Sequence, residues 1–432
     1  MIASGRERSD RLSAARQGHS HRGNVRMGPM FLKLLKRAGW VTAGNVVGQA
    51  LVLVSTLWLA RMYSPSEFGI FALIIIVSNI SVALSNLRFD VAIPSSSEDE
   101  YLGLTALAVF SNVFSASIVT LSLVVSNEMD IISSELVKNS SPLIFATILT
   151  SGSFQTLSAK LVREEKFRLL GLIRGAQGLA FVAFASIPAV GLLWAQALSL
   201  AWGLAIFPVA LKAVQQLGFR NIASLLRRQW KLPLFSLPGA ALDVIGYSMV
   251  VWVLMSAYGA SEAGTYSQLQ RLLGGPLMLI SISLGQVLLR QTVDHAGDPE
   301  LMHSLLSKVL FGMIGLLVLV LIAVLIAGAP VLEAILGDQW VVDPMMAVFI
   351  TIAVGVRACI SPLSSALITL RRFGVVLTWQ VIYFSSAVIL FPLMAARLEF
   401  KSYVVFYALH ELVLYTLYLA LIWWSISRKE AL

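Results

Sequence analysis

The stretch YSPSEFGIF at residues 63–71 is followed 195 positions later by YGASEAGTY at residues 258–266. Tyrosine, serine, glutamate and glycine recur at the same places in the two stretches, and Phe71 of the first corresponds to Tyr266 of the second. Connectors between helices favour serine and glycine in any protein, so coincidence also explains a likeness of this length. The positions of the two stretches in the fold decide between a true repeat and coincidence.

The composition is that of a polytopic membrane protein. Of the 432 residues, 57% are apolar and only 13% are charged, whereas about a quarter of the residues of a soluble protein are charged. The net charge of +9 has to be tested against membrane topology before a nucleic-acid partner is inferred from it. The only cysteine, Cys359, lies in an apolar run, which excludes an intramolecular disulfide and a cysteine-based metal cluster.

Twelve segments are long and apolar enough to cross a bilayer, which takes about 20 mostly apolar residues per helix. The predicted spans are residues 39–60, 68–87, 101–125, 142–159, 169–190, 191–211, 232–258, 265–289, 309–329, 344–370, 375–396 and 403–424. The fifth and sixth form one continuous apolar run, in which Pro188 and Gly191 predict a turn. We therefore expect an all-α membrane protein with about twelve transmembrane helices.

Lysine and arginine residues orient these spans, because they concentrate on the cytoplasmic side of a membrane. With the N-terminus inside, the inside segments hold sixteen such residues even when the first nine, which precede the first span, are left out. The outside loops hold only four, which are Arg61, Lys138, Arg397 and Lys401. Both termini are therefore expected in the cytoplasm, and topology explains the positive charge without RNA or DNA as a partner.

This topology gives the two recurring stretches a meaning. The first connects spans one and two, the second connects spans seven and eight, and both lie outside. Because six spans separate them, an even number, the two halves have the same orientation and form a parallel repeat of two six-helix bundles.

The chain is accordingly divided into four parts. Residues 1–30 are basic and have no apolar stretch of the kind that a signal peptide needs, so we interpret them as a disordered cytoplasmic tail, with Met27 and Met30 as alternatives to Met1 for the start. The remaining parts are an N-terminal bundle at residues 31–211, a basic cytoplasmic linker at residues 212–231 and a C-terminal bundle at residues 232–427.

Sequence motifs argue against an enzyme. The phosphate-binding loop of an ATPase needs a Gly-Lys dipeptide, which does not occur in the chain. His410 and Glu411 begin a metalloprotease-like pattern, but the position of the second histidine is Leu414. The predicted outside loops are too short for a catalytic domain. We therefore expect no enzymatic activity, no metal and no cofactor.

Charged and polar side chains within the spans are the candidate site residues. A charge near the bilayer centre costs about 2.5–3.5 kcal/mol on insertion scales, so it usually faces a cavity or the protein interior. Arg357 and Asp243 lie deep in their spans, whereas Arg174 and Arg271 lie nearer to span ends and can also reach the interface. Gln268 shares a helix face with Arg271. We expect these five residues to line a substrate lumen, with buried structural pairing as the alternative.

Two further residues are candidates for ion coupling. His410 and Glu411 are adjacent in the twelfth span and, together with Asp243, could bind a proton or another cation. A structural role for the His410–Glu411 pair is equally compatible with the sequence.

Five stretches resemble one known family. They are LARMYSPSEFGIFAL (59–73), LRFDVAIP (87–94), KLPLFSLPGAALD (231–243), EAGTYSQLQRLLGGPL (262–277) and LGDQW (336–340). As a set they resemble the polysaccharide transporters, the Wzx-type O-antigen and exopolysaccharide flippases of the multidrug/oligosaccharidyl-lipid/polysaccharide exporter superfamily. The likeness covers most of the chain, from about Phe31 to Arg428.

This resemblance implies a function and a set of partners. The chain would be a secondary transporter in the bacterial inner membrane that flips a lipid-linked oligosaccharide, typically on undecaprenyl pyrophosphate, for the synthesis of a surface polysaccharide such as O-antigen, exopolysaccharide or lipopolysaccharide. Membrane lipids, a polysaccharide polymerase and glycosyltransferases are the implied partners. Such flippases are thought to use a cationic lumen, and Arg357, Arg271 and Arg174 are suited to neutralise a pyrophosphate. Arg357→Ala is predicted to abolish export while the protein still inserts, and Arg357→Lys to preserve part of it.

Two other functions stay open. A cation-coupled multidrug exporter of the same superfamily would rely on acidic residues such as Asp243 and Glu411. A scaffold for polysaccharide enzymes would tolerate the loss of all the midplane charges. We favour the flippase, working by alternating access as residues 39–211 rock against residues 232–424.

Overall fold

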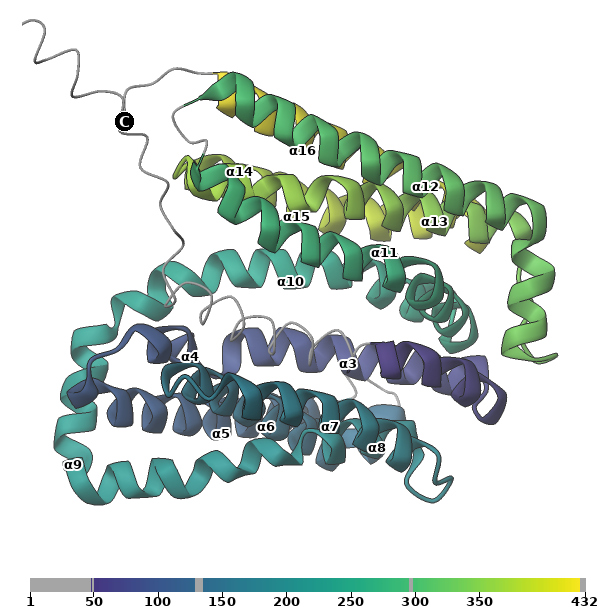
Figure 1. Ribbon diagram of the computed structural model, residues 1–432. Helices are drawn as coiled ribbons and strands as arrows, with labels where there is room; N and C mark the ends of the chain where they lie inside the picture. Colours follow the sequence, from purple (N-terminus) through teal and green to yellow (C-terminus); the bar gives the residue numbers. More distant parts are fainter. Residues whose placement is uncertain (1–47, 49, 129–134, 295–297, 428–432) are drawn as a thin grey trace, which may run out of the picture.

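The computed structural model describes residues 48, 50–128, 135–294 and 298–427, and this part of the chain is built from helices alone (Figure 1). A helical segment at Ala50–Met62 comes first. The α-helices that follow are α3 (Pro65–Ser85), α4 (Phe89–Ala92), α5 (Glu98–Glu128), α6 (Glu135–Arg163), α7 (Phe167–Ala185), α8 (Gly191–Ser199), α9 (Phe207–Gln229), α10 (Lys231–Ala257), α11 (Ala260–Asp294), α12 (Pro299–Leu336), α13 (Pro344–Ile360), α14 (Ser365–Thr369), α15 (Phe373–Ala395) and α16 (Phe400–Ser427). Three short 3₁₀ segments are η1 (Ile93–Ser95), η2 (Ala201–Ile206) and η3 (Ser361–Ser364). The predicted all-α fold is confirmed.

Ten helical stretches of the described chain are long and apolar enough to cross a membrane. They match the second, the third and the fifth to twelfth predicted spans. The fourth predicted span lies in α6, which is long but is not among these ten. The first is described only in part, as the shorter apolar helix Ala50–Met62, and the predicted tail at residues 1–30 lies outside the described residues. The total of twelve spans stays a prediction.

Local sequence explains where several helices begin and end. Ser64 and Glu67 form a reciprocal capping box at the start of α3, in which the Glu67 amide donates to the Ser64 hydroxyl and the Ser64 amide donates to the Glu67 carboxylate. The Asp343 carboxylate accepts a hydrogen bond from the Met346 amide and caps α13. The predicted turn between the fifth and sixth spans is confirmed, because α8 begins there at Gly191 with a φ of 71°, a value that glycine adopts readily.

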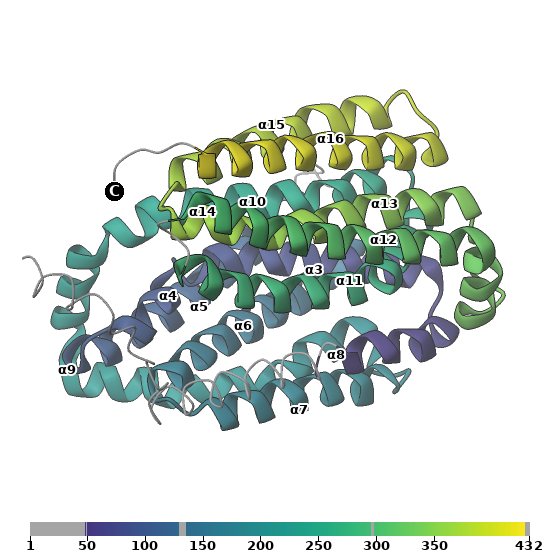
Figure 2. The same cartoon turned by 45° about the horizontal axis from the view of Figure 1, so that its top comes forward.

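The helices gather into two groups along the chain. We call the described chain up to α9 the N-terminal half and α10 to α16 the C-terminal half. Within the first, α5 packs against α6 and α9; within the second, α10 packs against α15, and α13 packs against α12 and α16. Figure 1 shows helices α3–α8 on one side and the green to yellow helices α11–α16 on the other, and the turned view of Figure 2 shows α3 and α11 next to each other where the groups meet. The halves meet chiefly where α3 lies against α11 and α10. A parallel repeat of two six-helix bundles remains our interpretation.

At one end of this contact the two recurring stretches touch each other. A Cβ atom added to Gly69 would lie 1.9 Å from the carbonyl oxygen of Ala260, and one added to Gly264 would lie 1.7 Å from the carbonyl oxygen of Pro65. Gly69 aligns with Gly264 in the repeat, and Pro65 aligns with Ala260. The backbones of α3 and α11 therefore cross where there is no room for a side chain, as small residues permit in membrane helices, and the contact is equivalent from either half.

The LGDQW stretch closes the same end. Trp340 Nε1 donates a hydrogen bond to the carbonyl oxygen of Ala60 at 2.8 Å. Gln339 Nε2 donates to the same oxygen at 2.7 Å and to the carbonyl oxygen of Tyr63 at 3.1 Å. The Trp340 side chain is almost fully buried and meets the ring of Phe68 edge-on. We define the sealed end by six residues: Ala60, Tyr63, Gly69, Gly264, Gln339 and Trp340.

Candidate substrate cavity

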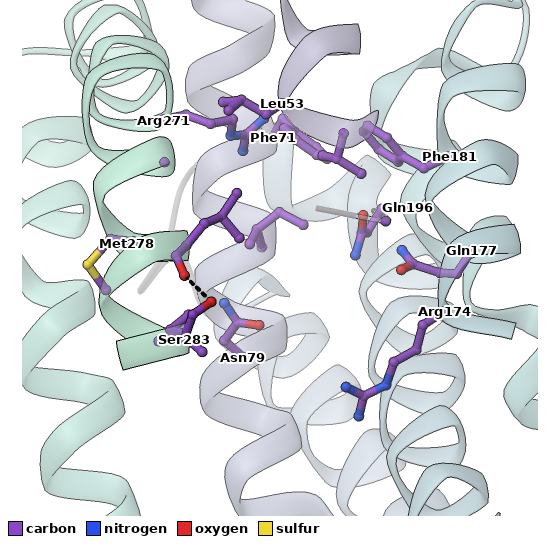
Figure 3. A pocket seen from close by; sticks show the side chains of 16 residues that line it. Leu53, Phe71, Asn79, Arg174, Gln177, Phe181, Gln196, Arg271, Met278 and Ser283 are labelled. Atoms are coloured by element: carbon purple, nitrogen blue, oxygen red, sulfur yellow. Dashed lines mark hydrogen bonds between the residues drawn. The ribbon is translucent and has the colours of Figure 1, made fainter. Parts of the chain in front are cut away.

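A cavity of about 470 Å³ lies between the halves, further along α3 and α11 from the sealed end. Its walls come from the helical segment before α3, from α3, α7 and α8, and, in the C-terminal half, from α11. Six lining residues are polar or charged: Asn79, Arg174, Gln177, Gln196, Arg271 and Ser283. Apolar side chains and glycines make up the rest of the wall, so the polar groups are few and face a shared space (Figure 3).

Two arginines reach the cavity from different halves. Arg174 is on α7 and Arg271 is on α11, and no acidic side chain of the described residues pairs with either. The Arg271 guanidinium lies 5.3 Å from the centroid of the Phe71 ring, and its Nη1 atom is buried without a hydrogen-bond partner in the described part of the chain. Figure 3 shows the two arginines toward opposite ends of the labelled side chains, with Gln196 and Gln177 between them. The cavity can therefore accept negative charge at two places.

Three carboxamides complete the polar wall. Asn79 on α3, Gln177 on α7 and Gln196 on α8 make no side-chain hydrogen bond with other described residues. Each carboxamide has donors and acceptors to offer to hydroxyl groups of a ligand. The sequence predictions did not include these three residues, because charge within the spans selected the candidates and Gln268 was added only for its place beside Arg271. A signal was present in Gln177, which follows Arg174 at the same three-residue spacing that joins Gln268 to Arg271.

A second cavity of about 270 Å³ adjoins the first. It lies among α3, α10, α11 and α13, and five residues line both cavities: Ile75, Asn79, Arg271, Gly275 and Met278. Arg271 is therefore accessible from both. Two other polar groups on this wall are already bonded, because Gln270 Nε2 donates to the Tyr247 hydroxyl at 3.1 Å and the Ser267 hydroxyl donates to the carbonyl oxygen of Ala263 at 2.7 Å.

Gln268 does not line either of these cavities. Its side chain is 1% exposed, and Nε2 donates a hydrogen bond to the carbonyl oxygen of Thr56 at 3.1 Å. Thr56 lies in the helical segment before α3, so this bond connects the two halves. Gln268 and Arg271 thus share a helix face, as predicted, but they have different surroundings.

Arg357 lies in the C-terminal half, behind the wall of the second cavity. Its guanidinium stacks on the ring of Tyr247, at 3.8 Å from the centroid, and lies 5.8 Å from the centroid of the Tyr415 ring. Tyr247 lines the second cavity, whereas Arg357 lines neither cavity. Its Nη1 atom is buried without a hydrogen-bond partner among the described residues. Of the three arginines predicted to line a lumen, Arg174 and Arg271 therefore line the first cavity, and Arg357 does not.

His410 and Glu411 belong to a buried polar cluster near Arg357. The Tyr383 hydroxyl donates to Glu411 Oε1 at 2.7 Å, and His410 Nε2 lies 2.9 Å from the Ser386 hydroxyl. Glu411 has no exposed surface, and its Oε2 atom has no hydrogen-bond partner in the described chain. Asp243 is exposed on α10 and lines neither cavity. Within the described residues, no group of three or more His, Cys, Asp or Glu side chains is arranged to hold a metal ion.

Comparison with known families assigns the chain. A family described as "Polysaccharide biosynthesis protein" matches residues 58–343, which is more than half of the sequence. The chain belongs to this family. The resemblance seen in the five sequence stretches is thereby confirmed. No similar sequence was found among the curated proteins.

Solved structures of low identity share the fold of this polysaccharide biosynthesis protein. A multidrug resistance MATE family transporter of the MOP superfamily, in an inward-facing conformation, aligns with a TM-score of 0.62 at 11% identity over 88% of this chain and 94% of that chain. The lipid II flippase MurJ, in an inward closed conformation, aligns with a TM-score of 0.66 at 13% identity over 88% and 87%. A mutant of the Vibrio cholerae MATE transporter VcmN aligns with a TM-score of 0.54 at 13% identity over 90% and 95%. The chain therefore has the fold of these membrane transporters.

Proposed function

We propose that this protein is a secondary transporter that flips a lipid-linked oligosaccharide across the bacterial inner membrane by alternating access. The observation that carries the proposal is the cavity between the halves, where Arg174 and Arg271 face one space without acidic partners among the described residues. The substrate class is an oligosaccharide on undecaprenyl pyrophosphate, used for a surface polysaccharide such as O-antigen, exopolysaccharide or lipopolysaccharide. A polymerase and glycosyltransferases would act on either side of this step.

The chemistry of the cavity fits the two polar parts of such a substrate. Guanidinium groups bind phosphate oxygens through charge-assisted hydrogen bonds, and their planar geometry permits two parallel bonds to one phosphate. The carboxamides of Asn79, Gln177 and Gln196 suit sugar hydroxyls, which both donate and accept. The lipid chain would stay among the helices and lipids beside the cavity.

The sealed end fits one state of an alternating-access cycle. In the predicted topology the connectors that form it lie outside, so the conformation described here would be closed to the outside and would receive substrate from the cytoplasm. Both termini and the linker at residues 212–231 would then be cytoplasmic.

The buried cluster around Glu411 is our candidate for coupling transport to an ion gradient. The Glu411 carboxylate has no exposed surface and one oxygen without a hydrogen-bond partner among the described residues, so that oxygen is available to a bound cation. His410 is adjacent, and Asp243 is the third coupling candidate. Tyr247 connects this region to the cavity, because it stacks on Arg357 and lines the second cavity.

The same cluster favours a second candidate function, a cation-coupled multidrug exporter. This function would use Glu411 and Asp243 to move drugs, and polysaccharide export would not depend on the protein. Drug efflux that follows a proton or sodium gradient in a strain with intact surface polysaccharide would support it.

A gene deletion tests the primary proposal. In the deletion strain we expect a lipid-linked oligosaccharide to accumulate on the inner leaflet and surface polysaccharide to disappear, and the wild-type gene should reverse both changes. The double variant Arg174→Ala with Arg271→Ala should insert into the membrane and fail to restore export. Arg397→Ala, at an exposed arginine far from the cavity, serves as the control and should restore it. Full export by the double variant would rule out the arginine site, and unchanged polysaccharide in the deletion strain would rule out the function.

A further inference from the structure

The linker between the halves contains a helical arm that runs across the ends of the spans. Helix α9 is interrupted at Gly218, whose φ of 73° and ψ of 154° are not helical. The part before this break belongs to the stretch Gly191–Gly218, which is apolar enough to cross a membrane. Figure 1 shows that the part after the break turns and crosses from the N-terminal half toward the start of α10. We call residues 219–230 the linker arm.

Packing fixes which face of the linker arm points inward. Ile222 and Leu225 are buried in the same hydrophobic core as Leu104 and Leu107 of α5. Arg228 is tied to the start of α5, because its Nη2 atom lies 2.9 Å from Glu100 Oε1. The arm therefore cannot rotate about its axis without breaking these contacts.

The opposite face of the arm carries two arginines. Arg220 and Arg227 are exposed and lie seven residues apart, which is two helical turns, so they point in nearly the same direction. Neither has an acidic partner in the part of the chain that the structure describes. Acidic groups at this end are engaged elsewhere: Glu98 pairs with Arg163, Glu100 pairs with Arg228, and Glu164 pairs with Lys160 and Lys166.

Apolar side chains stand beside these arginines. Leu226 is 40% exposed and Trp230 is 51% exposed, and both lie on the flank of the arm between its basic face and its buried face. Tryptophan is enriched at the level of lipid headgroups because its ring is both apolar and polar. A helix that lies in the plane of an interface with basic residues beside exposed Leu and Trp is typical of membrane-surface binding.

We propose that the linker arm binds the anionic headgroups of the membrane that the spans cross. Arg220 and Arg227 contact lipid phosphates, and Trp230 and Leu226 enter the headgroup layer. Charge complementarity favours this partner, because the arm offers two positive groups without acidic partners among the described residues and crosses at the ends of the spans. The arm would then anchor the connection between the halves to the membrane while the halves move. This inference does not depend on the identity of the transported substrate.

Hydrogen exchange of the full-length protein in lipid nanodiscs tests the proposal. The backbone amides of residues 219–230 would be compared in phosphatidylcholine alone and in equal amounts of phosphatidylcholine and phosphatidylglycerol. We expect exchange of the arm to slow in the anionic discs by roughly fivefold for each arginine, and high salt should remove the difference because it screens surface charges. Arg220→Gln and Arg227→Gln should each lose part of the effect, and the double variant should lose it all.

Arg397→Gln is the matched control, because it removes one exposed arginine at the other end of the molecule and should keep the full effect. Unchanged exchange elsewhere in the double variant would show that the protein is folded. Equal exchange of the wild-type arm in both kinds of disc would overturn the proposal. A lipid effect that survives in the double variant would also overturn it. Protection found only in native membranes, and lost when peripheral proteins are washed away, would indicate a protein partner and overturn the proposal too.

Discussion

The sealed end and the cavity lie along the same pair of helices, α3 and α11, yet they are built in opposite ways. At the sealed end, Gly69 and Gly264 let the two backbones touch, and the side chains that close it donate to main-chain carbonyls. In the cavity, Asn79 and Arg271 of the same two helices have polar groups without partners among the described residues. One helix pair thus provides both a closed contact and a wall of the candidate cavity, because glycine removes side chains at one end and polar side chains line a space further along.

The difference also indicates how the sealed end could open. The hydrogen bonds that Gln339 and Trp340 donate there are between neutral groups, and each contributes only about 0.5–1.5 kcal/mol. Beside them, the charged Arg61 guanidinium donates to the carbonyl oxygens of Ala334 and Ile335, and both bonds are exposed. A tight glycine contact adds packing but no covalent or ionic link. The sealed end can therefore exclude substrate while remaining within reach of a conformational change.

The largest effect is expected from Gly264→Leu. The new side chain would need the space of the Pro65 carbonyl, so α3 and α11 could not close and export should be abolished. The measurement is surface polysaccharide, together with a disulfide cross-link between Ala60→Cys and Gln339→Cys in a Cys359→Ala background. We expect the cross-link in the double-cysteine protein that keeps Gly264, and not in the same protein with Gly264→Leu. Gly312→Leu is the control, because a Cβ atom there has no neighbour within 4 Å; similar losses in both variants would contradict the role of the contact.

The next effect concerns the cavity. Arg271→Ala should lower export by roughly ten- to a hundredfold, because charge-assisted hydrogen bonds worth about 1.5–3 kcal/mol are lost. Arg271→Lys should retain part of the activity, since it keeps the charge but loses the planar guanidinium. Export would be measured at matched membrane levels of the protein. Equal export by the alanine variant and the wild type would remove Arg271 from the site.

Tyr247 separates Arg357 from the second cavity and allows the two predicted arginine sites to be distinguished. Tyr247→Leu should lower the free energy of unfolding by about 2 kcal/mol, because the stacked cation loses its aromatic partner. Tyr247→Phe keeps the ring and loses only the acceptor for Gln270, so its cost should be about 1 kcal/mol or less. Thermal unfolding in detergent measures both. Equal destabilisation by the two variants would show that the hydroxyl group, and not the ring, supports Arg357.

A smaller change is expected at Trp340. Trp340→Phe removes the hydrogen bond to Ala60 but keeps an aromatic ring next to Phe68, so the sealed end should open more often by roughly fivefold, as a loss of about 1 kcal/mol implies. Distance measurements between spin labels on the two sides of the sealed end would report the open fraction. An unchanged fraction would mean that the glycine contact alone holds this end closed.

The smallest effect should come from the ion pair at the rim of this end. Lys401 Nζ lies 2.5 Å from Asp343 Oδ2, and this hydrogen bond holds the pKa of the Asp343 carboxyl below its usual value, although partial burial acts in the other direction. The contribution of the pair to stability is therefore complete above the ordinary aspartate pKa of about 4 and is lost as the pH falls through the lowered value. Because Lys401 is exposed, the contribution should be below about 1 kcal/mol.

Thermal unfolding of Lys401→Met and of the wild type would show this loss. The two proteins should differ slightly at neutral pH and converge in acid below the lowered pKa. A difference that persists at the lowest pH would contradict an ionic origin.

Much of the fold followed from the sequence because spans and their ends are local features. Apolar length located the spans, and Pro188 with Gly191 marked the turn. The start of α3 was not predicted, because the second span was placed from Phe68 onward and the capping box of Ser64 and Glu67 was not recognised. The recurring stretches suggested a repeat, but no pattern showed that Gly69 and Gly264 meet. That contact depends on how two distant helices cross, which is a tertiary property.

The candidate site was only partly accessible from sequence. Depth and charge selected Arg174 and Arg271, which the structure places on one cavity. The same criteria selected Arg357, but its neighbour Tyr247 is 110 residues away in the chain, so its separation from the cavity could not be read from its own span. The amides Gln177 and Gln196 carry no charge, and their value as ligands becomes evident only when they face the same space.

The glycine contact at the sealed end has a consequence for the origin of the architecture. Gly69 meets Ala260 while their repeat equivalents Gly264 and Pro65 meet each other, so residue i touches j and j touches i. This reciprocity is the signature of an isologous interface, the kind formed by two identical subunits about a two-fold axis. The place where the chain is most tightly joined thus has the geometry of a homodimer, now held within a single polypeptide.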